Sequence, residues 1–300
     1  WLQKMASAAQ KLNYTGTFTY QSGGNSETSR ITHLVDAAGE QEKLEVLDGS
    51  PREVVRSNDE VKCFLPDDKL VIVEKRGRYK AFPALLPASV STLGEFYLIR
   101  LGDVSRVAGF DSQLILLEPK DTLRYGRHLW AEINSGLILK ARTVNERHET
   151  TEQFAFTQLR GEVQAVATAP INKEALKPRF AAESTAWRIH NAQASQSLSA
   201  GGGWLFKAQL PGFKKSAGMK RQASQGGTAE TTHFIFTDGL SSISLFIEPL
   251  ADRKAEQATY SVGAINVYKR ATDNHLLTVL GEVPMASLMR LGDGMELKRK

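Results

Sequence analysis

The chain has 300 residues, of which 41% are hydrophobic and 24% are charged. This length suits two domains rather than one, and the apolar runs, such as Leu114–Leu117, are too short to form a transmembrane helix. Thirty-eight basic and 33 acidic residues give a net charge of +5. The sequence has neither a basic helix nor an aromatic–basic platform, so it does not predict nucleic-acid binding.

The positive excess lies entirely in the C-terminal part. Residues 1–186 hold 24 basic and 24 acidic side chains, whereas residues 187–300 hold 14 basic and 9 acidic ones. This asymmetry is typical of a surface for an acidic partner or an anionic lipid head group, or of a solvated face with a basic end. For the first alternative, the candidate partner-binding residues are Lys207, Lys214, Lys215, Lys220 and Arg221.

The N-terminal part predicts one helix and then a meander of strands. Trp1, Met5 and Leu12 recur at helical spacing, which indicates an amphipathic helix over Trp1–Leu12. Because Trp1 is not an initiator methionine, we expect a removed signal peptide or a trimmed chain. Alternating strands follow at Tyr14–Tyr20, Ser29–Val35, Lys43–Leu47, twice within Leu47–Asp68, and at Leu70–Glu74. This order predicts a curved antiparallel sheet.

The segment Tyr79–Leu101 interrupts the strand pattern. Two prolines bracket apolar residues in 82–87, and the apolar residues from Leu93 to Leu101 recur at helical spacing. We expect this segment to cross the open mouth of the sheet and to enclose either a packed core or a cavity for acyl chains. The candidate cavity residues are Phe82, Leu85, Leu86, Phe96, Tyr97 and Leu101.

Strand signals then resume and continue to the end of the chain. They lie at Val104–Phe110, Gln113–Leu117, Tyr125–Ile133, Leu137–Val144 and Glu152–Leu159, and later at Trp187–Ile189, Trp204–Leu210, His233–Thr237, Ser242–Ile247, Tyr260–Tyr268 and His275–Gly281. A closing helix is expected near Pro284. Loss of periodicity around Pro170 and Pro178 predicts a linker at 167–186 between domains at 1–166 and 187–300.

The sequence lacks the usual signatures of catalysis. A single cysteine, Cys63, permits no internal disulfide, and its place on a strand face with Val61 and Leu65 predicts a buried thiol. The histidines are scattered, and there is no metalloprotease motif, nucleophile elbow or phosphate-binding loop. We therefore predict no metal, no cofactor and no enzymatic activity, with a carboxylate-based hydrolase as an open alternative.

Four segments resemble the signatures of a known family. They are Leu47–Arg56 with Phe64-Leu65-Pro66, Trp204–Phe213, Thr237-Asp238-Gly239-Leu240 before Ser242–Ile247, and Val279–Pro284 before the last helix. In this collinear order they resemble the RseB/MucB family, periplasmic regulators of the sigma-E/AlgU envelope-stress pathway in Gram-negative bacteria. The resemblance covers essentially the whole chain.

The resemblance implies a mostly β, α+β fold. The N-terminal domain would be an unclosed, curved antiparallel β-sheet (half-barrel) with helices, similar to the LolA/LolB lipoprotein carriers. The smaller C-terminal α+β domain would bind an anti-sigma factor.

The resemblance also implies a function. The protein would bind the periplasmic part of an RseA/MucA-like anti-sigma factor and shield it from site-1 proteolysis. Lipopolysaccharide or the acyl chains of mislocalised lipoprotein would release it. A periplasmic lipoprotein or lipid carrier is the alternative, and a homodimer or a higher oligomer is left open.

Overall fold

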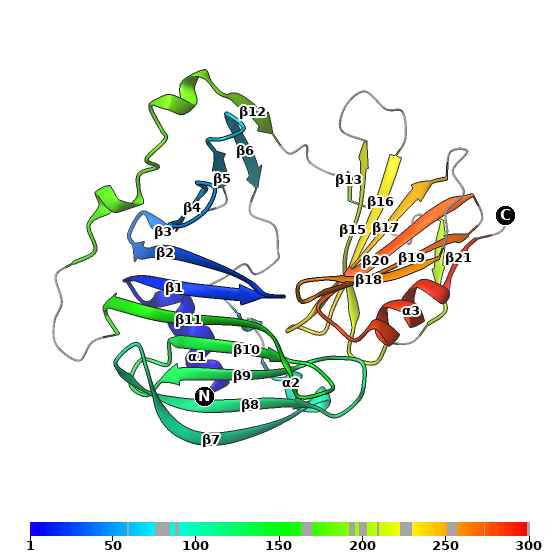
Figure 1. Cartoon of the computed structure of the whole chain (residues 1–300), viewed down its shortest axis with the longest axis horizontal. Helices are drawn as coiled ribbons and strands as arrows, with labels where there is room; N and C mark the ends of the chain where they lie inside the picture. The colour runs from blue at the N-terminus through cyan, green and yellow to red at the C-terminus, as the bar shows by residue number, and fades with distance from the viewer. Residues whose placement is uncertain are drawn as a thin grey trace.

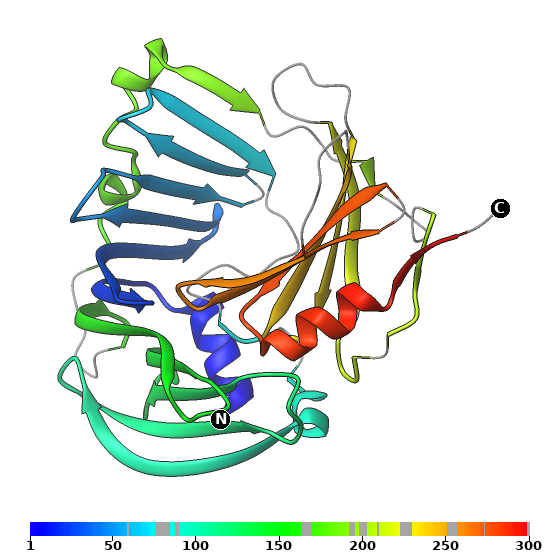
Figure 2. The same ribbon diagram turned by 45° about the vertical axis from the view of Figure 1, so that its right-hand side comes forward.

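The computed structural model describes residues 1–58, 60–75, 85–87, 90–163, 170–191, 196–197, 203–208, 210–222, 230–250, 257–272 and 274–298. Within this part of the chain, a large curved sheet and a smaller sheet lie side by side (Figures 1 and 2). The chain is therefore mostly β, with two sheet domains, as the sequence predicts.

The larger sheet forms the N-terminal domain. Among the described residues it has twelve strands, all antiparallel to their neighbours except β12, which runs parallel to β6. Their order is β12 (Arg188–Asn191), β6 (Leu70–Lys75), β5 (Glu60–Leu65), β4 (Glu53–Ser57), β3 (Gly39–Val46), β2 (Asn25–Asp36), β1 (Tyr14–Ser22), β11 (Thr150–Gly161), β10 (Ile138–Val144), β9 (Gly126–Glu132), β8 (Phe110–Pro119) and β7 (Tyr97–Val107). In the described chain the edge strands β12 and β7 do not pair, so the sheet is unclosed.

The core of this domain lies on the concave face of the sheet. Alternate residues such as Phe18, Ile31 and Ile115 point there and are buried. Helix α1 (Leu2–Lys11) lies within the curve (Figure 2) and adds Met5 and Ala8 to the same core. The predicted amphipathic helix is therefore confirmed, and it covers the concave face.

The segment after the prolines differs from the prediction. Helix α2 covers only Leu93–Phe96, and Tyr97 already has extended backbone angles. Strand β7 then reverses into β8 through Ala108 and Gly109, which both have positive φ. The helical spacing does not extend the helix to Leu101, because the chain from Tyr97 onward pairs with β8 as a strand. The predicted single strand Val104–Phe110 was also wrong, because the two-residue turn with left-handed backbone divides it between β7 and β8.

The predicted linker packs against the outer face of the first sheet. It contains two short helical turns, η1 (Lys173–Leu176) and η2 (Glu183–Ala186). The buried Lys43 donates to the carbonyl oxygen of Lys177 at 2.8 Å. The chain then enters β12, so the strand expected at Trp187–Ile189 joins the first sheet rather than the second. The domain limits 1–166, 167–186 and 187–300 stay a prediction.

The smaller sheet forms the C-terminal domain. Its order is β13 (Gln196–Ser197), β15 (Lys214–Gln222), β16 (Glu230–Thr237), β17 (Ser242–Pro249), β20 (His275–Gly281), β19 (Ile265–Thr272) and β18 (Ala258–Val262), with β14 (Trp204–Phe206) and β21 (Met295–Leu297) as a separate pair. Helix α3 (Met285–Asp293) buries Leu288 and Leu291 against this sheet, which confirms the closing helix. The predicted strand Tyr260–Tyr268 was wrong, because Gly263, with positive φ, turns β18 into β19.

Cys63 lies on β5, where it faces Val54 and Ile72 on the neighbouring strands. It is half-buried rather than buried. Burial nevertheless raises the pKa of its thiol, which keeps the sulfur in its unreactive, protonated form near neutral pH.

Candidate functional site

A cavity of about 230 Å³ lies in the concave face of the first sheet. Its apolar lining consists of Phe18, Tyr20, Leu44, Leu85, Ala141 and Phe154. Four residues of charged type also border it: Glu27, Arg127, Arg142 and Glu152. An apolar cavity with a few polar groups suits a ligand that has an apolar body and a polar end.

Of the five predicted cavity residues that the structure describes, one lines this space. Leu85 does so, whereas Leu86 is 2% exposed and belongs to the packed core. Leu101 lies on the edge strand β7 and is 59% exposed, because the chain there is a strand and not a helix. Phe82 lies outside the described residues. As ligand contacts, the predicted residues stay a prediction.

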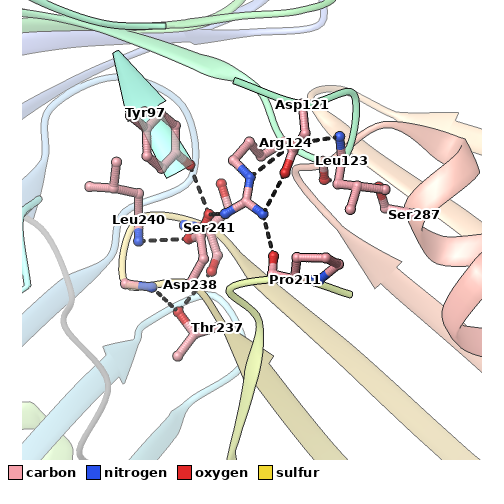
Figure 3. A network of polar contacts seen from close by, with 11 residues as sticks. Tyr97, Asp121, Leu123, Arg124, Pro211, Thr237, Asp238, Leu240, Ser241 and Ser287 are labelled. Carbon is pink, nitrogen blue, oxygen red and sulfur yellow. Dashed lines mark hydrogen bonds and ion pairs between the residues drawn. The ribbon is translucent and has the colours of Figure 1, made fainter. Parts of the chain in front are cut away.

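Tyr97 lies instead where the two domains meet (Figure 3), and Phe96 lies beside it against Arg124. The centre of this junction is the guanidinium of Arg124, from the loop between β8 and β9. It donates to Asp238 of the C-terminal domain at 2.8 Å and to Asp121 in its own loop at 3.0 Å. It also donates to the carbonyl oxygen of Pro211. The side chains of Arg124 and Asp238 are both 0% exposed, so the pair is fully desolvated.

Aromatic rings and a phenol complete this site. The Arg124 guanidinium carbon lies 4.7 Å from the ring centroid of Phe96 and 5.0 Å from that of Phe213. The hydroxyl of Tyr97 donates to the same Asp238 oxygen at 2.8 Å. Burial and the charge of Asp238 raise the pKa of Tyr97, which keeps the phenol protonated as a donor.

Each domain also inserts a side chain into the core of the other. Leu123 is part of the C-terminal core, and Leu240 packs against the N-terminal core. The hydroxyl of Ser287 on α3 donates to the carbonyl oxygen of Leu123 at 2.8 Å. The junction is therefore an extension of both cores rather than a surface contact.

Three of the four segments that the sequence analysis singled out meet at this junction. They supply Pro211 and Gly212, Asp238, and Glu282. Gly212 has a φ of +86°, and a Cβ there would lie 2.9 Å from Arg124, so glycine is required. Sequence reasoning missed Arg124 itself, whose only signal is an arginine between Leu123 and Tyr125.

A second ion cluster lies beside the cavity. Arg127 on β9 pairs with Glu152 on β11 at 3.7 Å and with Glu282 of the C-terminal domain at 3.3 Å. Arg127 and Glu152 also line the cavity. One guanidinium thus contacts the cavity and both domains.

Four of the predicted basic partner-binding residues lie on β15, and Lys207 directly follows β14. Lys214 and Lys215 are exposed, and the Nζ atom of Lys215 lies 5.5 Å from the ring centroid of Phe234. Lys207 pairs with Glu296 at 2.5 Å and Lys220 with Glu230 at 2.7 Å. The side chain of Arg221 lies outside the described residues. Their role in binding stays a prediction.

Among the described residues, no group of three or more His, Cys, Asp and Glu side chains could hold a metal ion. Nor does this part of the chain contain a helix long and apolar enough to cross a membrane. The absence of a cofactor and of enzymatic activity stays a prediction.

Comparison with known proteins points to one family over nearly the whole chain. Residues 1–180 match the model of the MucB/RseB N-terminal domain, and residues 199–296 match that of the MucB/RseB C-terminal domain. The sigma factor AlgU regulatory protein MucB of Pseudomonas aeruginosa is 30% identical, over 97% of this chain and 88% of the relative. The sigma-E factor regulatory protein RseB of Haemophilus influenzae is 24% identical over the same shares.

A solved structure also matches the complete fold. The P. aeruginosa MucA/MucB complex contains a chain with 27% sequence identity and a TM-score of 0.79. The match covers 100% of this chain and 98% of the solved one. Both domains are therefore represented in a single relative.

Proposed function

The chain belongs to the MucB/RseB family, and on this premise we propose that it is a periplasmic negative regulator of an envelope-stress sigma factor. It binds the periplasmic part of a membrane-anchored anti-sigma factor and shields that segment from site-1 proteolysis. The observation that carries this proposal is the match of the whole chain to a MucB solved together with MucA.

The proposed release signal is a lipid-like molecule, such as lipopolysaccharide or the acyl chains of a mislocalised lipoprotein. The apolar cavity with charged residues in its lining supports a ligand of this class. Because Arg127 and Glu152 line the cavity and also lie at the junction, a ligand there can influence how the domains meet. The ligand must bind the released form more tightly than the complexed form, since equal affinity would shift nothing.

Charge reversal at Lys214, Lys215 and Arg221 is expected to weaken binding of the anti-sigma segment by roughly tenfold or more and to flatten its salt dependence. The reason is that these residues would meet an acidic segment of the partner. The measurement is a titration of the segment at several salt concentrations. A matched control reverses the exposed Lys11, Lys69 and Arg147 of the N-terminal domain. Equal affinity of the two triple variants would remove this surface from the proposal.

A lipoprotein or lipid carrier is the second candidate function, and the cavity is the observation that favours it. The two candidates differ in what the purified protein does without an anti-sigma factor. A carrier would pass lipoprotein from a donor to an acceptor, whereas a regulator would bind acyl chains without completing transfer. The intimate junction with a second domain favours the regulator.

A further inference from the structure

Two carboxylates from different domains share one guanidinium at the junction. Glu152 belongs to the first sheet and Glu282 to the turn between β20 and α3, and both pair with Arg127. The side chains of Glu152, Glu282 and Arg127 are 19%, 29% and 15% exposed. With both carboxylates ionised, the cluster holds one uncompensated negative charge in a largely desolvated place.

Among the described residues, Arg127 is the cation that pairs with these two carboxylates, and the neighbouring groups do not add a second one. Tyr20 on β1 is a neutral phenol, because burial and its hydrogen bond with Glu152 raise its pKa. The hydroxyl of Thr143 on β10 already donates to Glu152 at 3.2 Å. Arg142 follows Ala141 on β10 and therefore points to the opposite face of the sheet, where it donates to Gln153 at 2.5 Å and lies 5.4 Å from the ring of Trp130. A proton is the remaining way to compensate the charge.

We propose that closing the two domains takes up one proton, which Glu152 and Glu282 share, so that the junction is proton-linked. This inference does not depend on the identity of the partner or of any lipid. It makes the contact between the domains stronger in mildly acidic surroundings and weaker in alkaline ones. The pair Arg124–Asp238 holds the other side of the junction.

The direction in which the pKa of Glu282 changes on closure decides whether acid strengthens or weakens the junction. Burial raises the pKa of Glu282 from 4.5 to about 7, Arg127 opposes this rise, and Glu152 adds to it. A carboxyl whose pKa is higher in the closed form binds more protons there. The stabilisation of the closed junction by this proton is therefore fully present below pH 4.5 and is lost as the pH rises through 7.

The structure offers a backbone reporter close to this cluster. The amide of Ala264, in the β18–β19 turn, donates across the junction to the hydroxyl of Ser22 at 3.0 Å. Ser22 is the direct cross-strand neighbour of Glu152. Hydrogen exchange at Ala264 thus measures opening of the junction on the side where the proton is bound.

The test combines two measurements on the full chain. The first is a carbon-13 titration of the Glu282 carboxyl, with an expected midpoint near 7. The second is exchange of the Ala264 amide, corrected for the intrinsic pH dependence of exchange. From these rates we obtain the equilibrium constant for opening of the junction, and we expect it to rise at least ~10-fold between about pH 5 and pH 8. The rise in the pKa of Glu282 from 4.5 to about 7 sets an upper limit of ~300-fold.

Glu282→Gln is expected to flatten this pH dependence, because it removes the titrating group and keeps the size of the side chain. Glu248→Gln, at an exposed position on β17, is the matched control and should behave like the unmodified protein. A Glu282 midpoint near the ordinary 4.5, or the same exchange profile in both variants, would overturn the proposal. If Glu282→Gln does not fold, the titration of the unmodified chain decides alone.

Discussion

Replacing Arg124 with alanine is expected to lower the free energy of unfolding by about 3–5 kcal/mol, the range for breaking a buried ion pair by removal of one partner. Asp238 would be left 0% exposed at its side chain, with the Tyr97 hydroxyl and its own loop amides as its remaining donors. The carbonyl oxygen of Pro211 would lose its donor as well. Urea unfolding followed by circular dichroism measures this change.

The control is Arg100→Ala, because Arg100 forms an exposed pair with Glu118. Removing that pair should cost no more than about 1 kcal/mol. The double variant of Arg124 and Asp238 should lose less stability than the sum of the single variants, since the two residues share one interaction. The unfolding curve of Arg124→Ala should also separate into two transitions as the domains uncouple. Equal decreases in the free energy of unfolding for Arg124→Ala and Arg100→Ala would contradict the importance of the Arg124–Asp238 pair for stability.

Filling the cavity is expected to have the largest effect on ligand binding. Ala141 lines the cavity beside Phe154, its cross-strand neighbour. A tryptophan at position 141 would occupy much of the 230 Å³ and weaken binding of dansyl undecanoic acid by at least ~10-fold. Overpacking itself should cost only about 1–3 kcal/mol. Fluorescence titration of the probe checks this expectation.

The matched control is Ala155→Trp. Ala155 follows Phe154 on the same strand and therefore points to the opposite face of the sheet. The Ala155→Trp variant should have about the same stability as the unmodified protein and should bind the probe equally well. Equal binding by both tryptophan variants would show that the probe does not enter the cavity.

The sequence predicted the type of fold better than the turns at which the chain reverses between neighbouring strands. Period-2 patterns located most of the strands, and the spacing of Met5 and Leu288 located the first and last helices. The hairpin at Ala108 and Gly109 was missed, because Ala108 takes the place of the Asn, Asp or Gly that usually precedes glycine in such a turn. The spacing up to Leu101 is compatible with both a helix and an edge strand, and only the pairing of β7 with β8 decides between them.

The site was less predictable, because it is built from long-range contacts. Arg124 and Asp238 are 114 positions apart, and no local pattern links them. The resemblance singled out Asp238 and Glu282 as parts of motifs, but their partners Arg124 and Arg127 lie outside every motif. Likewise, β12 joins β6 only because the linker returns along the outer face of the sheet. Such contacts depend on the folded topology.

Direct binding of the cognate anti-sigma factor is the measurement that tests this account most directly. The full chain would be titrated by calorimetry with the purified periplasmic segment of that factor, with and without an acyl ligand. We expect a saturable complex that protects the segment from site-1 cleavage and that dissociates when the ligand is added. A segment that neither binds nor is protected at any tested concentration would contradict the proposed function.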